Sequence, residues 1–326
     1  MERYVGRTQQ VRGAELYTLE DGTGKGMRML YVRNGRGLEA WISLDRAGDL
    51  VRVSYHGKNL GWFSPCGFVA PEHYGTVGYA RSFTAGFCYT VGLDNAGVAC
   101  EDAGEVLPQH GTLSMKAATV MGREEDKEGL TVKLQELDGV MFGRKLVLNR
   151  VYRFSYTEDT IVMEDTVINE GDTESPCLIM YHCNMGYPLL GERCELTIPH
   201  DKMWATTPQA KANMDTAMQM ESPQDGYEER CYFYDIADPR VDLYNPEIGI
   251  GMTMTFDKDE LPCFTEWKMM GKTEYVLGLE PANCTPDGRN VLRENGTLKF
   301  LNPDESKTTE VKFIFTESPK EFKGEF

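Results

Sequence analysis

Two segments far apart in the chain each place a group capable of proton transfer directly after a run of apolar residues. His182 follows Cys177–Tyr181, and Glu280 follows Tyr275–Leu279. An imidazole, with an unperturbed pKa of about 6.5, can donate or accept a proton near neutrality. A carboxylate withdrawn from water is a stronger base when it is ionised. A histidine and a glutamate facing one pocket could therefore protonate one atom of a substrate and deprotonate another.

Both residues also have a structural interpretation. His182 could be a hydrogen-bonded histidine without chemistry, and Glu280 could be a buried acid paired with an arginine. Asn184, Gly186 and Pro188 follow the histidine closely, so the strand is predicted to end at His182. A histidine at the end of a strand would lie at the mouth of a cleft.

Three other side chains are candidates for contact with a ligand. His110 lies between Gln109 and Gly111 on a predicted tight loop, where binding residues often gather. Arg81 could donate two hydrogen bonds to ligand hydroxyls, or it could form a structural salt bridge. Trp267 could stack on a ligand ring, although a core position is the ordinary interpretation for tryptophan.

Two motifs that would indicate other chemistry are incomplete. The glycine-rich segment Asp21–Gly26 lacks the spacing of a phosphate-binding loop. The cysteines and histidines show no metal-ligand spacing. The sequence therefore predicts neither a metal nor a cofactor.

Short runs rich in β-branched and aromatic residues, separated by turn residues, indicate the elements that position these groups. One short helix is predicted at Gln209–Met220, a methionine-rich segment that could also form a rim loop. The pattern predicts one large antiparallel all-β domain over residues 1–326, with the first ~50 residues as an extension or edge strands. The predicted strands are Lys145–Phe154, Thr160–Ile168, Cys177–His182, Cys194–Ile198, Cys231–Ile236, Gly249–Phe256, Tyr275–Glu280, Thr297–Leu301 and Glu310–Phe315.

Charge and composition narrow the class of protein. With 34 basic and 51 acidic side chains the net charge is −17, which argues against nucleic acid and anionic membrane partners. No apolar run reaches the ~18 residues of a membrane span, and the polar N-terminus does not resemble a signal peptide. The nine cysteines are scattered singly, so reduced thiols and a cytoplasmic location are expected.

Four short motifs occur in an order and at spacings that are specific together. They are Arg81–Gly86 continuing into Gly92–Gly97, then Pro108–Gly111, Tyr181–Pro188 and Tyr275–Asn283. Through these motifs, from Leu50 to the C-terminus, the chain resembles the aldose 1-epimerase superfamily of galactose mutarotase-like proteins. The resemblance is to a poorly characterised branch of that superfamily.

The resemblance implies a β-supersandwich with its site on the concave face of a large sheet. It implies that His182 is the general acid and Glu280 the general base, with Arg81 and His110 holding the substrate. The implied activity is the interconversion of the anomers of a free sugar by ring opening, without a cofactor.

The resemblance also implies further contacts to sugar hydroxyls. Asn95 belongs to the first motif and is expected to bind substrate. The family uses an aspartate as well, for which Asp235 and Asp238 are the two candidates. Tyr181 and the Met185-Gly186 pair depart from the Asn-His-x-Tyr-Phe-Asn signature of well-studied mutarotases. We expect this departure to affect which substrate binds more than the acid–base chemistry.

Two other functions remain open at this point. One is the isomerisation or epimerisation of a sugar acid, keto-sugar or sugar phosphate on the same scaffold. The other is carbohydrate binding without turnover, which the presence of both His182 and Glu280 disfavours. The expected partner is a small sugar, and a homodimer is compatible with the sequence.

Overall fold

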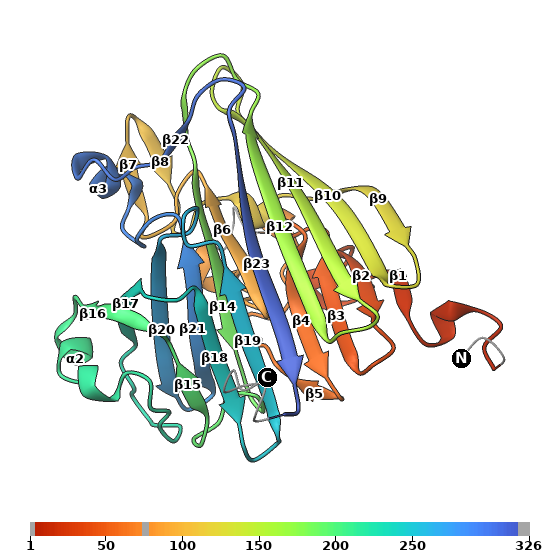
Figure 1. The fold of residues 1–326 in the computed structure, drawn as a ribbon. Helices are drawn as coiled ribbons and strands as arrows, with labels where there is room; N and C mark the ends of the chain where they lie inside the picture. The colour runs from red at the N-terminus through yellow and green to blue at the C-terminus, as the bar shows by residue number, and fades with distance from the viewer. Residues whose placement is uncertain (1–3, 74–77, 319–326) are drawn as a thin grey trace.

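The computed structural model describes residues 4–73 and 78–318, which form two large antiparallel sheets packed face to face (Figure 1). The first sheet has eleven strands. In spatial order they are β1 (Gly13–Thr18), β2 (Arg28–Arg33), β3 (Leu38–Ser43), β4 (Asp49–Tyr55), β6 (Cys88–Leu93), β14 (Leu178–Met185), β21 (Glu274–Ala282), β20 (Cys263–Gly271), β17 (Arg230–Ile236) and β16 (His200–Ala205), with β5 (Lys58–Asn59) paired to β4.

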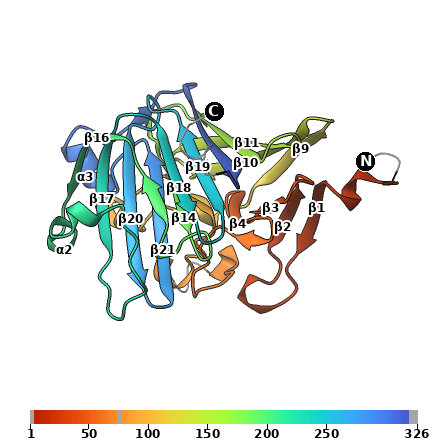
Figure 2. The same cartoon turned by 60° about the horizontal axis from the view of Figure 1, so that its bottom comes forward.

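The second sheet has eight strands, and its outer strand β9 lies beside β1 of the first sheet (Figures 1 and 2). In spatial order they are β15 (Glu195–Thr197), β18 (Arg240–Asn245), β19 (Ile250–Phe256), β23 (Ser306–Thr316), β12 (Thr160–Asn169), β11 (Lys145–Ser155), β10 (Gly129–Gly139) and β9 (Thr119–Glu125). Two small ribbons pair β7 (Cys100–Asp102) with β8 (Glu105–Leu107) and β13 (Ser175–Pro176) with β22 (Phe300–Leu301).

Helices are short and lie outside the two sheets. Helix α2 (Pro208–Lys211) contacts β16 and β17, and α3 (Arg289–Glu294) contacts β7 (Figure 1). The 3-10 helices are η1 (Thr8–Gln10), η2 (Gly22–Gly24), η3 (Pro71–His73), η4 (Tyr79–Arg81), η5 (Leu113–Met115) and η6 (Met214–Thr216). Within the described ranges, no helix is long and apolar enough to cross a membrane. The predicted all-β sandwich is confirmed.

The main core lies between the two sheets and arises from alternating side chains. In β10, for example, Leu130, Val132 and Leu134 are buried, and the residues between them are only partly buried.

A polar cluster crosses this core. Arg150 donates to Asp165 on β12 and to Asp49 on β4, so one buried guanidinium ties the second sheet to the first.

Strand β14 is buried on both faces. Tyr181 and Cys183 point into the main core, whereas Leu178 and Met180 join a second apolar cluster on the opposite face of the sheet. This second cluster includes Leu292 of α3, so helix and loop segments cover the outer face of the strand here. Burial on both sides explains why the strand is an apolar run in the sequence without alternation.

Three predicted boundaries are wrong. Strand β14 does not end at His182 but continues to Met185, because the backbone of Gly61 and Trp62 pairs with its last residues. The predicted strand Thr297–Leu301 contributes only β22, and the predicted helix Gln209–Met220 contributes only α2 and the single turn η6. Thr297 and Leu298 instead donate their backbone N–H groups to the carbonyl of Leu292 in α3, and turns follow both α2 and η6.

Candidate active site

His182 and Glu280 lie directly opposite each other on neighbouring strands. The register of β14 and β21 pairs Cys183 with Leu279 and Asn184 with Gly278, which sets His182 opposite Glu280. Directly opposed residues of an antiparallel pair project from the same face of the sheet with close Cβ atoms. The imidazole Nε2 accordingly lies 3.3 Å from the carboxyl Oε1.

The pair is almost completely withdrawn from water. The side chains of His182 and Glu280 are 7% and 4% exposed, respectively. Burial, helped by the nearby carboxylate of Glu229, raises the pKa of Glu280 to about 8. Burial lowers the pKa of His182 to about 3, and the neighbouring His110 acts in the same direction. These shifts favour a neutral pair at pH 7, with the titrating proton on Glu280.

The pair forms part of the wall of a cavity of about 780 Å³ on the outer face of the first sheet. Strands β17, β20 and β21 contribute every second residue, because only one face of the sheet borders the cavity. His182 Nδ1 and Glu280 Oε1 have no hydrogen-bond partner among the described residues. Both atoms are buried, and Glu280 Oε1 faces His182 Nε2 at 3.3 Å. The aromatic residues of the lining are Trp62, Tyr79, Phe83, Trp204, Tyr227, Phe233 and Trp267.

Gly278 gives Glu280 the room that this geometry needs. It lies two residues before Glu280 on the same face of β21 and opposite Trp267 on β20. A Cβ atom at Gly278 would lie 2.5 Å from Glu280 Oε1 and 2.9 Å from Trp267 Cβ. No side chain can occupy this position without displacing the carboxyl group.

His110 lies next to His182, with the two rings at 5.6 Å and nearly perpendicular. It has a positive φ of 60° and directs its Nδ1 to the carbonyl of Ala96 at 3.4 Å. A carbonyl only accepts, so this hydrogen bond places the proton on Nδ1 and leaves Nε2 as the acceptor of the ring. Burial lowers the pKa of His110 to about 4, which keeps the ring neutral. The following residue, Gly111, has no room for a side chain, because a Cβ atom would lie 2.4 Å from Asp94 Oδ1.

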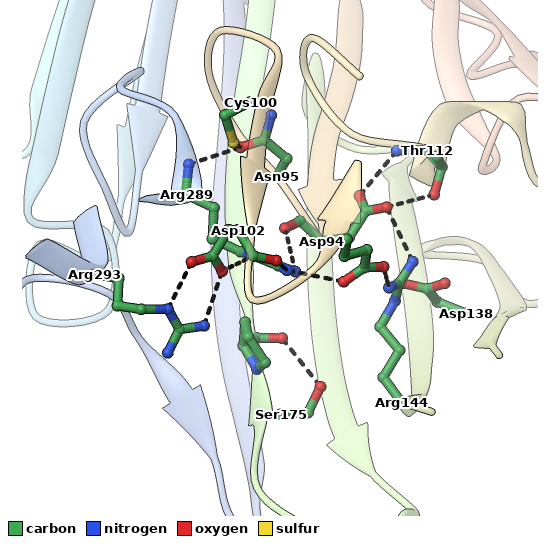
Figure 3. Close-up of polar contacts among 12 residues, drawn as sticks. Asp94, Asn95, Cys100, Asp102, Thr112, Asp138, Arg144, Ser175, Arg289 and Arg293 are labelled. Carbon is green, nitrogen blue, oxygen red and sulfur yellow. Dashed lines mark hydrogen bonds and ion pairs between the residues drawn. The ribbon is translucent and has the colours of Figure 1, made fainter. Parts of the chain in front are cut away.

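A network of ion pairs holds the loop that carries His110 (Figure 3). Asp94 accepts hydrogen bonds from the backbone and hydroxyl of Thr112, both at 3.0 Å. Arg144, at the end of the β10–β11 hairpin, pairs with Asp94 at 3.0 Å and with Asp138 at 2.9 Å. The imidazole is therefore positioned by charges in the second sheet that do not themselves border the cavity.

Trp267 lines the cavity beside His182, with the two rings 5.3 Å apart. Its Nε1 donates to Glu229 Oε2 at 2.8 Å, and Glu229 also borders the cavity. Glu229 is not among the residues predicted from the sequence, because the charged run Glu228–Arg230 has the pattern of a solvated turn. Its position just before an alternating strand was the only available signal.

The other selected residues lie outside the cavity lining. Arg81 is exposed on η4, although its neighbours Tyr79 and Ala80 line the cavity. Asp235 and Asp238 are both exposed, with Asp235 near the end of β17 beyond the lining residues of that strand.

Asn95 also stays outside the lining, because its amide is committed to backbone groups. The amide nitrogen donates to the carbonyls of Val98 and Pro108. The amide oxygen accepts from the backbone nitrogen of Arg289, as Figure 3 shows. Asn95 thus connects the His110 loop to α3. Its contacts are structural ones, in contrast to the substrate contact expected for it.

The side chains of the lining that can carry a charge near neutral pH are acids and histidines. Glu229, Glu274, Glu280 and Asp287 border the cavity, and among the described residues no lysine or arginine does so. No cluster of three or more histidine, cysteine or carboxylate side chains with the arrangement of a metal site occurs within the described ranges.

The chain matches the profile of one protein family over most of its length. The profile of a protein family described as a domain of unknown function, DUF4432, matches residues 24–314, and the chain belongs to this family. No curated protein matches the chain.

Solved structures match closely in fold. A candidate aldose 1-epimerase from Klebsiella pneumoniae superposes with a TM-score of 0.87 at 20% identity, over 94% of this chain and 86% of that chain. A galactose mutarotase-like protein from Clostridium acetobutylicum gives 0.67 at 13% identity, over 94% and 99%. A galactose 1-epimerase from Lactobacillus acidophilus gives 0.65 at 15% identity, also over 94% and 99%. The galactose mutarotase-like fold implied by the sequence motifs is confirmed, and these identities speak for the fold alone.

Proposed function

We propose that this protein interconverts the anomers of a free sugar by acid–base ring opening at His182 and Glu280. The observation that carries the proposal is the 3.3 Å contact between His182 Nε2 and Glu280 Oε1 in the wall of a large cavity. General acid–base catalysis needs both groups within hydrogen-bond reach of one small substrate. Two groups on directly opposed positions of adjacent strands meet that requirement.

The single proton of the pair suits a reaction that runs in both directions. Transfer of that proton from Glu280 to His182 turns the neutral pair into a carboxylate and an imidazolium. The carboxylate then takes the proton of the anomeric hydroxyl while the imidazolium protonates the ring oxygen. The bond between the anomeric carbon and the ring oxygen breaks, and the anomeric oxygen becomes a carbonyl. Rotation and closure on the other face reverse each transfer and restore the pair.

The charge of the cavity favours a neutral sugar over a sugar acid or sugar phosphate. Phosphate and carboxylate groups are normally held by arginine or lysine. The lining has acids such as Glu229 and Asp287 but no basic side chain among the described residues. Carboxylates are suited to accept hydrogen bonds from sugar hydroxyls, and Trp267 offers a flat surface to the apolar face of a ring.

Magnetisation-exchange NMR of anomers across neutral sugars, uronates and sugar phosphates tests the proposal. We expect exchange above the spontaneous rate for at least one neutral sugar. His182→Asn and Glu280→Gln should each lower it by at least ~10²-fold, and the double variant should be scarcely slower than either, because the groups act as a unit. Wild-type rates in both single variants, or no acceleration with any sugar, would contradict the proposal. Binding without acceleration would instead identify a carbohydrate-binding protein.

A further inference from the structure

The cavity extends well beyond the catalytic pair along one row of the sheet. Strand pairing sets Glu280 on β21 opposite Thr265 on β20, Thr265 opposite Phe233 on β17, and Phe233 opposite Trp204 on β16. All of these residues line the same cavity. Neighbouring strands are ~4.8 Å apart, so three steps place Trp204 roughly 14 Å from Glu280.

One sugar ring cannot fill this row. A six-membered ring built from ~1.5 Å bonds is roughly 7 Å across with its hydroxyl groups. A ring whose anomeric centre lies at His182 and Glu280 reaches Thr265 and Trp267, but it ends before the outer strand. About half of the row therefore lies outside the reach of a monosaccharide.

The outer half of the row has the character of a sugar-binding surface. Trp204 and Phe233 stack with centroids 5.9 Å apart and planes at 29°. Trp204 is 37% exposed at the rim of the cavity, although tryptophan is usually well buried. Aromatic side chains pack against the C–H faces of sugar rings. The hydroxyl groups at the edge of a sugar ring need polar partners from the protein. The exposed Thr206 lines the cavity next to this pair and carries a hydroxyl group. Lys202, which is not part of the lining, places its Nζ over the Trp204 ring at 5.5 Å from the ring centre.

We propose that Trp204 and Phe233 form a subsite for a second sugar residue, and that the preferred substrate is a neutral reducing disaccharide. Its reducing ring would occupy the His182–Glu280 end of the row, and its second ring would lie on the aromatic pair. This inference rests on the proposed function, since it takes the reaction at the reducing end as given. It adds a substrate class and a second subsite to that reaction.

The test compares Trp204→Ala with the wild type on monosaccharides and reducing disaccharides. The magnetisation-exchange assay with glucose, galactose, maltose, cellobiose and lactose gives kcat/KM for each sugar. At least one disaccharide should be preferred by the wild type, and Trp204→Ala should lower kcat/KM for it by ~10-fold, while monosaccharide turnover changes less than ~2-fold. Trp41→Ala is the matched control, because Trp41 also stacks on an aromatic neighbour, Tyr31 at 4.7 Å, but does not line the cavity.

A binding measurement separates the failure of this inference from the failure of the proposed function. Calorimetric titration of Glu280→Gln with the same sugars needs no turnover, and Trp204→Ala in that background should weaken disaccharide binding by ~10-fold. Monosaccharide turnover with no disaccharide preference and no effect of Trp204→Ala would overturn the subsite alone. No turnover of any sugar, together with disaccharide binding that depends on Trp204, would overturn the reaction and retain the subsite.

Discussion

Replacement of Glu280 by glutamine should stabilise the fold while it abolishes turnover. Burial raises the pKa of this carboxyl from its usual 4.5 to about 8, so Glu280 is neutral in the folded protein at pH 7 and ionised in the unfolded chain. The folded state then holds a proton that the unfolded state has lost. The free energy of unfolding must therefore fall as the pH rises from 4.5 to 8.

The size of this effect at pH 7 follows from how far that pH lies above the usual pKa of 4.5, because the folded-state pKa is higher still. Each unit corresponds to about 1.4 kcal/mol, so by pH 7 the buried acid lowers the free energy of unfolding by roughly 3 kcal/mol. Glutamine does not titrate and keeps the shape of the side chain. At pH 7, Glu280→Gln should be more stable than the wild type by up to that amount, with turnover lowered by at least ~10²-fold.

Urea denaturation of both proteins between pH 6.5 and 8 measures the difference. His182 is present in both proteins, so protonation of its imidazole in the unfolded chain contributes to both and largely cancels in the difference. Glu266→Gln is a matched control. Burial also raises the pKa of Glu266, to about 7, but its side chain lies on the opposite face of β20, where it accepts a hydrogen bond from Tyr234. This control should gain stability and keep its turnover.

A stability difference between Glu280→Gln and the wild type that does not grow as the pH rises from 6.5 to 8 would contradict the raised pKa of Glu280. A constant difference would mean that the carboxyl group is already ionised in the folded protein. The pair with His182 would then rest as an ion pair, and the single-proton description of the site would be wrong.

Three other predictions follow from the geometry of the site. Gly278→Ala should lower turnover by at least ~10-fold, measured by anomer exchange, because its Cβ atom would displace the Glu280 carboxyl; a fully active variant would refute the close packing. Arg144→Met should raise KM more than it lowers kcat, because the ion pairs that it loses position the loop of His110 at the cavity; equal effects on both constants would contradict this. The exchange rate should fall as the pH rises above about 8, where the shared proton is lost, and a rate that stays flat to pH 10 would exclude the shared proton.

Selection of residues from the sequence found some members of the cavity lining and also chose residues that lie away from it. His182 and Glu280 were selected because each follows an apolar run and stands in a motif of a known superfamily. The same reasoning selected Asn95 and Asp235, which the structure does not bring to the cavity. A motif records that a residue type recurs at a position, but it does not tell whether the side chain faces a ligand or holds a loop.

Glu229 and the aromatic wall could not be predicted from local pattern. Glu229 stands in a charged run that resembles a solvated turn, and it becomes part of the site only through its contact with Trp267. Phe233 and Trp204 stand on separate strands, and only the pairing of β16 with β17 brings them together. Such contacts depend on register between distant segments, which no short stretch of sequence contains.

The sequence by itself determined the all-β class, because short alternating and β-branched runs separated by turns can bury apolar area only as sheets. It also determined which residues could exchange protons. The tertiary structure alone decided that His182 and Glu280 meet out of water with shifted pKa values, because their low exposure and 3.3 Å separation arise from the register of two strands nearly a hundred residues apart. Desolvation and proximity set these pKa values, and both are properties of the packed sheet rather than of either residue.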